Sequence, residues 1–133
     1  MNISFARVAD MVGAEAASQV RDATLAIYRF AADYALERGI IIADTKMELG
    51  WRNNRLIVID ELVTPDSSRF WDVETYESGK SQPSFDKQPV RDWLIASGWN
   101  REPPPPDLPD QVVADTSARY REAFRRLTGH ELL

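Results

Sequence analysis

The spacing of apolar residues predicts helices toward both ends of the chain. In residues 14–38, apolar or weakly polar side chains recur every three or four positions, and charged side chains fall largely on the opposite side. Residues 110–127 carry a second stripe of this kind. A shorter helix is expected over residues 5–12, where Ser4 can cap the first turn and Gly13 can end the last. The simplest interpretation of these helices is a scaffold that buries one face of each.

Two β-rich runs between the long helices predict an antiparallel hairpin. The runs GIIIADTKMELG and LIVIDELV are joined by a short polar segment that contains Asn53 and Asn54. Asparagine tolerates the positive φ that tight hairpin turns require. The second run begins with the apolar residues LIVI, which predict a buried strand that ends at Asp60 and Glu61.

Charged residues alternate along the first of these runs. The run is predicted to form a strand in which Asp44, Lys46 and Glu48 all point to the same face of the sheet. A half-exposed sheet with a solvated charged face explains this pattern. A magnesium-nucleotide site explains it as well, because Mg²⁺ takes carboxylate and phosphate oxygens and lysine supplies a point charge for a phosphate. Whether Glu48 and Asp60 share a face depends on the strand register, which the sequence leaves open.

Two later segments combine acids, hydroxyls and basic groups. The segment TPDSSRFW, residues 64–71, uses residues that are common in turns, and its arginine adds a fork of donors that suits a phosphate. The segment FDKQPVRDWLIASG predicts a helix with Asp86 as N-cap and Pro89 at the third helical position. Lys87 and Arg91 would then lie near the positive end of that helix, where an anion is favoured. The alternative is that both are basic residues on the solvent face of an amphipathic helix.

Composition and charge narrow the classes of function. The 133 residues, 44% of them hydrophobic, suffice for a single α+β domain over residues 1–133. A net charge of −5 disfavours nonspecific binding to nucleic acid or to an anionic membrane. The chain has no cysteine, and its one histidine, His130, lies close to the end, which argues against thiolate chemistry and histidine-based sites. The lack of a long apolar run indicates a soluble, cytoplasmic protein.

Three motifs, in this order and at these spacings, resemble the carboxy-terminal half of SAICAR synthetase (phosphoribosylaminoimidazole-succinocarboxamide synthase): GIIIADTKMELG, IDELVTPDSSRFW and SFDKQPVRDWL. The resemblance runs from about residue 2 to residue 129. It implies an α/β arrangement related to ATP-grasp and kinase-like folds. It also implies an enzyme of purine biosynthesis that joins L-aspartate to carboxyaminoimidazole ribonucleotide through an acyl phosphate, with ATP as co-substrate and Mg²⁺ as cofactor.

The same resemblance implies roles for particular residues. The ribonucleotide would be held by Asp66, Ser67, Ser68, Arg69 and Arg91. The ATP phosphates would be served by Asp44, Lys46, Glu48, Asp60 and Glu61, with Glu48 and Asp60 as ligands of Mg²⁺. Catalytic roles would fall to Lys46, Asp60 and Lys87.

The sequence also departs from the family pattern. Family members usually have Phe where Met47 and Leu49 stand, and an aromatic residue where Pro89 stands. The family's amino-terminal half, with its glycine-containing phosphate loop, has no counterpart here. We therefore expect a portion of the synthetase that acts only with the missing amino-terminal half, in cis or in trans. The alternatives are a noncatalytic remnant that binds a purine-pathway nucleotide or another subunit, and an unrelated α+β domain.

Overall fold

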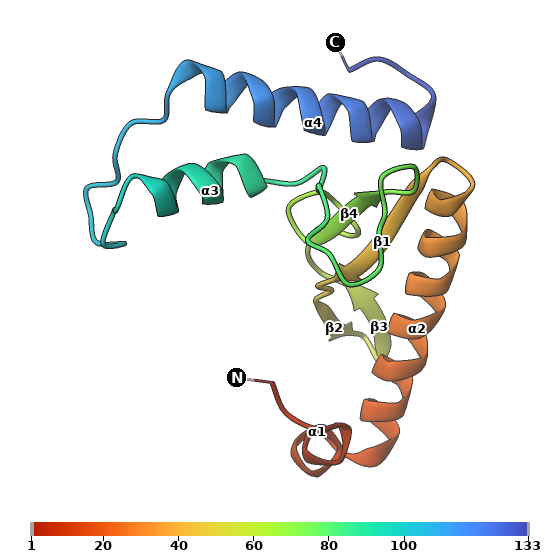
Figure 1. Ribbon diagram of the computed structural model, residues 1–133. Coiled ribbons are helices and arrows are strands. Elements are labelled where there is room, and N and C mark those ends of the chain that lie inside the picture. Colours follow the sequence, from red (N-terminus) through yellow and green to blue (C-terminus); the bar gives the residue numbers. More distant parts are fainter. Residues whose placement is uncertain (1, 133) are drawn as a thin grey trace.

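The computed structural model describes residues 2–132 as an α+β fold of four helices and two small antiparallel sheets (Figure 1). In chain order the elements are α1 (Phe5–Val12), α2 (Ala14–Leu36), β1 (Ile40–Thr45), β2 (Leu49–Arg52), β3 (Arg55–Val58), β4 (Ser68–Asp72), α3 (Gln88–Ala96) and α4 (Asp110–Thr128). The mixed class predicted from the sequence is confirmed. Within the described residues, no helix is both long and apolar enough to cross a membrane.

The residues that flank the first two helices act as the sequence predicts. Ser4 Oγ accepts a hydrogen bond from the backbone N–H of Arg7 at 3.2 Å and so satisfies one free donor of the first turn of α1. Gly13, with a φ of 90°, separates α1 from α2. Helix α2 ends at Leu36, slightly earlier than expected, and Gly39 carries the chain into β1 with a φ of 75°.

The predicted hairpin is formed by β2 and β3. Arg52 pairs with Arg55, so the connection has only two residues, Asn53 and Asn54. Their φ values are 49° and 59°, the left-handed conformation that a two-residue hairpin turn of type I′ requires. The turn chemistry predicted from the sequence is confirmed.

The prediction of one continuous first strand is wrong. β1 pairs with β4, which lies more than twenty residues later, and the register shifts between Ile42 and Asp44. The chain then leaves the strand before β2 begins, so Asp44 belongs to one sheet and Glu48 precedes a strand of the other. Side-chain alternation keeps charges on one face only within a single regular ladder. Asp44, Lys46 and Glu48 therefore do not lie on one face of a single strand, although Lys46 forms an ion pair with Glu48.

The prediction that the LIVI run forms a buried strand is also wrong. Ile57 and Val58 are each 37% exposed, and Ile59 is 57% exposed. β2 and β3 form a two-stranded sheet that leaves these side chains partly uncovered by residues 2–132. An apolar run indicates a segment that favours burial, but it does not indicate which other segment packs against it.

The start of α3 differs from the prediction by one residue. The helix begins at Gln88, after Lys87, so Pro89 occupies the second helical position instead of the third. Proline is tolerated there because the first helical N–H groups have no partner within the helix. Asp86 nevertheless accepts a hydrogen bond from the backbone N–H of Gln88 at 2.7 Å, so its carboxylate still anchors the helix start.

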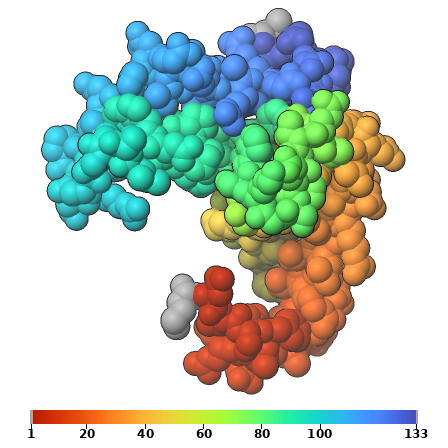
Figure 2. Space-filling model, in the orientation of Figure 1, coloured from red at the N-terminus to blue at the C-terminus, as the bar shows by residue number. Residues whose placement is uncertain are grey.

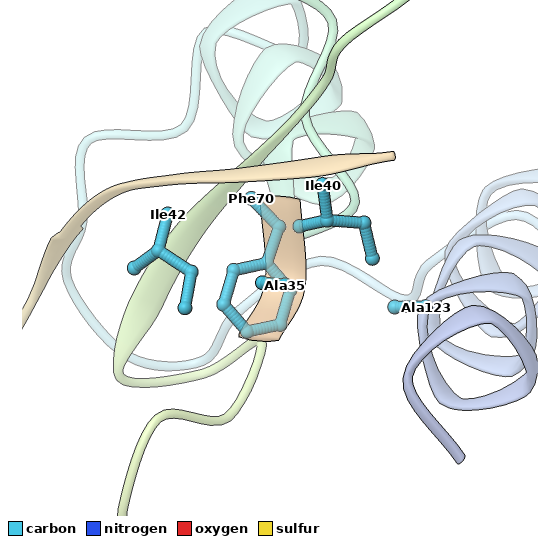
Figure 3. Close-up of a cluster of buried hydrophobic side chains, with 5 residues drawn as sticks. All are labelled: Ala35, Ile40, Ile42, Phe70 and Ala123. Carbon is cyan, nitrogen blue, oxygen red and sulfur yellow. The ribbon is translucent and has the colours of Figure 1, made fainter. Parts of the chain in front are cut away.

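The hydrophobic core lies between the β1–β4 sheet and the helices α2 and α4 (Figure 3). Its five buried side chains are Ala35 from α2, Ile40 and Ile42 from β1, Phe70 from β4 and Ala123 from α4. Burying a large side chain such as Phe70 stabilises the fold by about 1.5–3 kcal/mol. Because Ala35 is small, α2 can approach β1 closely.

Two tyrosine hydroxyls tie the long helix α2 to its neighbours. Tyr28 donates its hydroxyl proton to the carbonyl of Ile42 at 2.7 Å, and Tyr34 donates to the carbonyl of Leu127 at 2.8 Å. These bonds satisfy backbone acceptors of β1 and α4, so they hold secondary-structure elements together.

The elements form an open, curved molecule. Helices α3 and α4 lie side by side at one end, and α1 lies at the far end of α2 (Figure 1). Figure 2 shows a hollow in the surface between α1 and the end of α3. The two sheets lie between these ends, so the strand residues Asp44, Ser68 and Arg69 are near the middle of the molecule.

Candidate substrate and phosphate site

A cavity of about 330 Å³ lies where the end of β1, the segment before β4 and the start of α3 meet. It is lined by Asp44, Pro65, Asp66, Ser67, Ser68, Arg69, Asp86 and Arg91. All the residues that the sequence analysis assigned to the ribonucleotide are among them, together with Asp44. Lys87 joins this group through a 3.3 Å ion pair with Asp66. We call this space the DSSR cavity, after residues 66–69.

A tight turn places the DSSR segment against the end of β1. The backbone N–H of Thr64 donates to Ser67 Oγ at 3.0 Å, and the N–H of Ser67 donates to the carbonyl of Thr64 at 3.2 Å. The carbonyl of Ser67 in turn accepts from the N–H of Lys46 at 2.8 Å. Ser68 is buried, and its hydroxyl donates to Thr45 Oγ1 at 2.9 Å. Much of the hydrogen-bonding capacity of the two serines therefore holds the loop itself.

Asp44 orients the guanidinium of Arg69 across the β1–β4 ladder. Arg69 Nε donates to both carboxylate oxygens of Asp44, at 2.9 and 3.0 Å, and Nη2 donates to Oδ2. These hydrogen bonds hold the pKa of Asp44 below its usual range. Both side chains are about half exposed, so the pair contributes little to stability. Its main effect is to fix the direction of the arginine fork while leaving Nη1 free of this contact.

Asp86 is a buried acid between the basic groups of the site. It is 2% exposed, accepts from the N–H of Gln88 and lies 3.9 Å from Arg91 Nη1. A buried carboxylate needs such partners because desolvation disfavours its charge. From the sequence, Asp86 was expected only as a helix cap, and its approach to Arg91 was not predicted.

Asp66 receives two donors from distant parts of the chain. Lys87 Nζ lies 3.3 Å from Oδ1, and the hydroxyl of Tyr120 donates to the same oxygen at 2.8 Å. The hydrogen bond from Tyr120, followed by that from Lys87, lowers the pKa of Asp66. Burial and the Asp66 carboxylate raise the pKa of Tyr120. In the sequence, Tyr120 belongs to an apolar helical stripe, which gives no indication of this contact.

A larger cavity of about 710 Å³ adjoins the DSSR cavity and shares Arg69 and Asp86 with it. Lys80 and Arg119 add positive charge to its lining, and Arg119 Nη1 donates to the carbonyl of Ser84. No role was predicted for these two basic residues from the sequence. One lies in a polar loop and the other on α4, and only the fold brings them near Arg69.

A second charged cluster lies between the end of β1 and the base of the hairpin. Lys46 forms an ion pair with Glu48, and its pKa is raised first by Glu48 and then by the more distant charges of Asp60 and Glu61. The hydroxyl of Thr64 donates to Glu61. We call Lys46, Glu48, Asp60 and Glu61 the hairpin-base cluster. None of these residues lines the DSSR cavity.

The register of the β2–β3 hairpin determines whether Glu48 and Asp60, the two expected Mg²⁺ ligands, lie opposite each other. Leu49 pairs with Val58, and the N–H of Ile59 donates to the carbonyl of Glu48 at 3.0 Å. Glu48 therefore lies opposite Ile59 and not opposite Asp60. Among residues 2–132 there is no group of three or more acidic or histidine side chains that could hold a metal. The two carboxylates nevertheless have the donor chemistry of Mg²⁺, which often binds one or two protein carboxylates and completes its shell with water and phosphate oxygens.

Comparison with known proteins decides the family of this chain. The family model described as SAICAR synthetase matches residues 1–106. The chain belongs to the SAICAR synthetase family. The family predicted from the three sequence motifs is thus confirmed. Since the match ends before α4, Tyr120 and Arg119 lie outside it.

Individual relatives agree with this assignment. The phosphoribosylaminoimidazole-succinocarboxamide synthase of Maridesulfovibrio salexigens is 54% identical over 131 residues, which are 98% of this chain and 44% of that protein. The synthase of Streptomyces avermitilis is 55% identical over 132 residues, with 96% of this chain and 44% of that protein covered. The solved structure of the Saccharomyces cerevisiae SAICAR synthase complexed with SAICAR matches with a TM-score of 0.90 and 44% identity, over 99% of this chain and 44% of that chain. The chain thus spans less than half the length of these relatives.

Proposed function

We propose that this chain forms the substrate wall and part of the phosphate site of an ATP-dependent ligase of purine biosynthesis. The reaction joins L-aspartate to carboxyaminoimidazole ribonucleotide and gives SAICAR, ADP and phosphate. The observation that carries the proposal is the DSSR cavity, because residues that the family resemblance assigned to one substrate line one space. The S. cerevisiae relative, which superimposes with a TM-score of 0.90, was solved with SAICAR bound.

The cavity has the donor chemistry that a ribonucleotide phosphate requires. Arg69 and Arg91 present planar forks of N–H groups that match phosphate oxygens. Asp44 and Asp86 lie against these two guanidiniums, so a phosphate would meet donors that are already oriented. Asp66 would accept a hydrogen bond from a substrate hydroxyl. Ser67 and Ser68 would line the same site and hold its loop in place.

The hairpin-base cluster would serve the ATP phosphates. When bound, Mg²⁺ would neutralise charge on the phosphoryl group that is transferred. Glu48 and Asp60 would hold the ion, with Asp44 and Glu61 nearby. Lys46 would act as a point charge toward the phosphates.

The proposed chemistry needs positioning and charge stabilisation but no protein nucleophile. A carboxylate oxygen of the ribonucleotide attacks the γ-phosphorus of ATP, the bond to ADP breaks, and an acyl phosphate forms. The amine of aspartate then attacks the acyl carbon, phosphate leaves, and the new amide nitrogen loses a proton. Lys46 and Lys87 would stabilise the negative charge that develops on oxygen in these steps. Asp60 would contribute by holding Mg²⁺ at the ATP phosphates.

The exposed surface of the chain supports a contact with the rest of such an enzyme. A folded protein of 15.1 kDa exposes about 7,100 Å² on average, whereas this chain exposes 9680 Å². The excess is well above the ~800 Å² that one partner buries in a typical interface. The uncovered apolar residues of β3, together with Trp51 of β2, belong to this surface. We infer that the amino-terminal half found in the longer relatives covers it, in cis or in trans.

We also propose that residues 1–133 act as a single substrate- and metal-binding unit. Together with the amino-terminal half, this unit would form a fold related to ATP-grasp and kinase-like enzymes.

A second candidate function is noncatalytic binding of a purine-pathway nucleotide. The DSSR cavity supports it equally well, because a phosphate can bind there without turnover. The two functions differ in one respect: only the ligase function predicts that the chain produces SAICAR once the other half is supplied.

Calorimetric titration of the full chain with SAICAR tests the substrate site. We expect Arg69→Ala to weaken binding at least tenfold, since hydrogen bonds to charged groups contribute about 1.5–3 kcal/mol. Arg125→Ala is the matched control, because Arg125 also forms a forked pair, with Glu122, but does not line the cavity. A folded wild-type chain that does not bind SAICAR would contradict the proposal.

A further inference from the structure

Tyr120 connects α4 to the DSSR cavity through a single carboxylate. Its hydroxyl donates to Asp66 Oδ1 at 2.8 Å, although the two residues lie 54 positions apart in the sequence. Lys87 Nζ approaches the same oxygen at 3.3 Å. Within residues 2–132, no protein group donates to Oδ2 of Asp66. One carboxylate oxygen is therefore fixed by the protein, and the other remains available to a ligand.

The neighbours of Asp66 explain why it needs to be held. Two guanidiniums, Arg69 and Arg91, line the same cavity, and either could attract a mobile carboxylate. Such a contact would neutralise a donor that an anionic substrate needs. Asp44 and Asp86 are already paired with those guanidiniums, so a third acid in direct contact would leave the cavity poor in free donors.

We propose that Tyr120 is a positioning residue of this site: its hydroxyl holds Asp66 so that Oδ2 faces the substrate and the guanidiniums of Arg69 and Arg91 stay available to the substrate phosphate. The inference rests on the proposed function and deepens it, because it assigns a role in the DSSR cavity to α4, which lies outside the family match at residues 1–106. Tyr120 itself acts through Asp66 and does not line the cavity.

This arrangement has a pH signature. Asp66 is faced by Tyr120 from α4 and by Lys87 from the start of α3. The other charged groups of the cavity are Asp44, Arg69, Asp86 and Arg91. Because the Tyr120 hydroxyl lowers the pKa of Asp66, its removal raises that pKa. Substrate binding that needs ionised Asp66 would then be lost at a higher pH as the solution is acidified.

Tyr120→Phe tests the positioning role, with Tyr34→Phe as the matched control. Both substitutions remove a tyrosine hydroxyl that donates at 2.8 Å, but Tyr34 donates to the carbonyl of Leu127, away from the cavity. The ¹³C chemical shift of the Asp66 carboxyl is followed from pH 2 to pH 7 by NMR of the full chain. We expect the Asp66 titration to move to higher pH in Tyr120→Phe and to stay unchanged in Tyr34→Phe. An unchanged Asp66 titration in Tyr120→Phe would overturn the inference.

Affinity for SAICAR gives the second readout. We expect Tyr120→Phe to weaken binding about tenfold at neutral pH and to shift the acidic limit of binding upward, while Tyr34→Phe does neither. A double-mutant cycle with Asp66→Asn then separates positioning from general structural damage. If Tyr120 acts through Asp66, Tyr120→Phe has little further effect in the Asp66→Asn chain. Full additivity of the two losses would overturn the inference.

The experiment also separates this inference from the proposed function. If the folded wild-type chain fails to bind SAICAR, the proposed function fails, and the NMR titration still decides whether Tyr120 controls Asp66. If SAICAR binds with equal affinity to the wild type and Tyr120→Phe, the proposed function stands and the positioning role is wrong. If Tyr120→Phe unfolds, Asp66→Asn alone must weaken binding and leave the melting temperature almost unchanged; otherwise the role assigned to this pair is wrong.

Discussion

Individual side chains of the DSSR cavity are arranged in pairs of an acid and a base. Asp44 holds Arg69, Asp86 lies against Arg91, and Asp66 receives Lys87. The acid of each pair orients a basic group and offsets part of its charge. The cavity therefore offers oriented donors without a large excess of positive charge, which agrees with the acidic composition of the chain.

Asp44→Asn tests whether orientation of Arg69 matters for substrate binding. An asparagine provides one acceptor in place of a charged, bidentate partner, so the arginine fork loses its fixed direction. We expect SAICAR binding to weaken about tenfold, with little change in the free energy of unfolding because the pair is half exposed. Calorimetry and urea unfolding measure the two quantities.

The matched control for that prediction is Asp22→Asn. Asp22 also pairs with an arginine, Arg21, at 2.8 Å on an exposed surface of α2. Its substitution should change neither quantity. Equal SAICAR affinity of Asp44→Asn and the wild-type chain would show that Asp44 does not prepare Arg69 for the substrate.

The sequence predicted which residue types line the cavity but not how they pair. Asp66, Ser67, Ser68 and Arg69 were expected to line one site because the family resemblance implied it. The contact of Asp66 with Tyr120 joins residues 54 positions apart and depends on the packing of α4. No local pattern in the sequence reports such a long-range contact.

At the scale of secondary-structure elements, α4 packs against the core and contacts the DSSR cavity through the hydrogen bond from Tyr120 to Asp66. Its residue Ala123 is fully buried in the core, in one cluster with Ala35 of α2, Ile40 of β1 and Phe70 of β4. Arg126 forms ion pairs with Asp72 at the end of β4, at 3.1 Å, and with Glu122 at 2.7 Å. These contacts place α4 so that Tyr120 can reach Asp66.

Ala123→Leu should loosen this docking. Extra methyl groups in a well-packed core force shifts that cost about 1–3 kcal/mol, and a movement of α4 would also draw Tyr120 away from Asp66. We expect the free energy of unfolding to fall by about that amount, as measured by urea denaturation. Ala118→Leu, on an exposed position of the same helix, should change it little. Equal stabilities of the two variants would contradict the packing described for Ala123.

The acid dependence of stability should reflect the ion pairs of α4. Hydrogen bonds from Arg125 and Arg126 lower the pKa of Glu122 from 4.5 to about 2. Because the folded state favours the ionised form, Glu122 stabilises the fold above about pH 4.5, and this contribution is lost as the pH falls toward 2. In urea unfolding across this range, Glu122→Gln should make stability less dependent on pH. A slope equal to that of the wild-type chain would rule out this contribution.

Elements with local signals were predicted well, and elements that depend on distant partners were not. Helical periodicity, Ser4, Gly13 and the Asn53–Asn54 turn act over a few residues, and the structure agrees with them. The pairing of β1 with β4 joins segments that are far apart in the sequence. The register shift after Ile42 occurs in that long-range pairing, and the chain leaves β1 before β2 begins. Neither feature has a local signal in the sequence, so the alternating charges were wrongly assigned to one strand.

At the scale of the whole molecule, the main feature is the large exposed surface around an open, curved chain (Figure 2). The apolar strand β3 was expected to be buried, and its exposure is explained if the longer relatives cover it with the remainder of their sequence. The family match and the 44% coverage of the relatives are consistent with that interpretation.

Ile57→Asp tests whether β3 contacts the other half of the enzyme. Ile57 is 37% exposed in this chain, so an aspartate should destabilise the chain itself less than at a fully buried position. Placed in a desolvated interface, the unpaired charge should weaken association with the complementary half of the M. salexigens synthase at least tenfold. Analytical ultracentrifugation of the mixture measures this effect. Val113→Asp, at a 51% exposed apolar position on α4, is the control and should leave association intact.

SAICAR formation by a chimaera tests the central claim most directly. In this protein, residues 1–133 replace the matching 44% of the M. salexigens synthase, to which they are 54% identical. With carboxyaminoimidazole ribonucleotide, L-aspartate, ATP and MgCl₂, we predict SAICAR and ADP in equal amounts, and at least a hundredfold lower rate for Arg69→Ala in the same chimaera. A folded chimaera that binds SAICAR but forms none would contradict the ligase function and favour noncatalytic nucleotide binding.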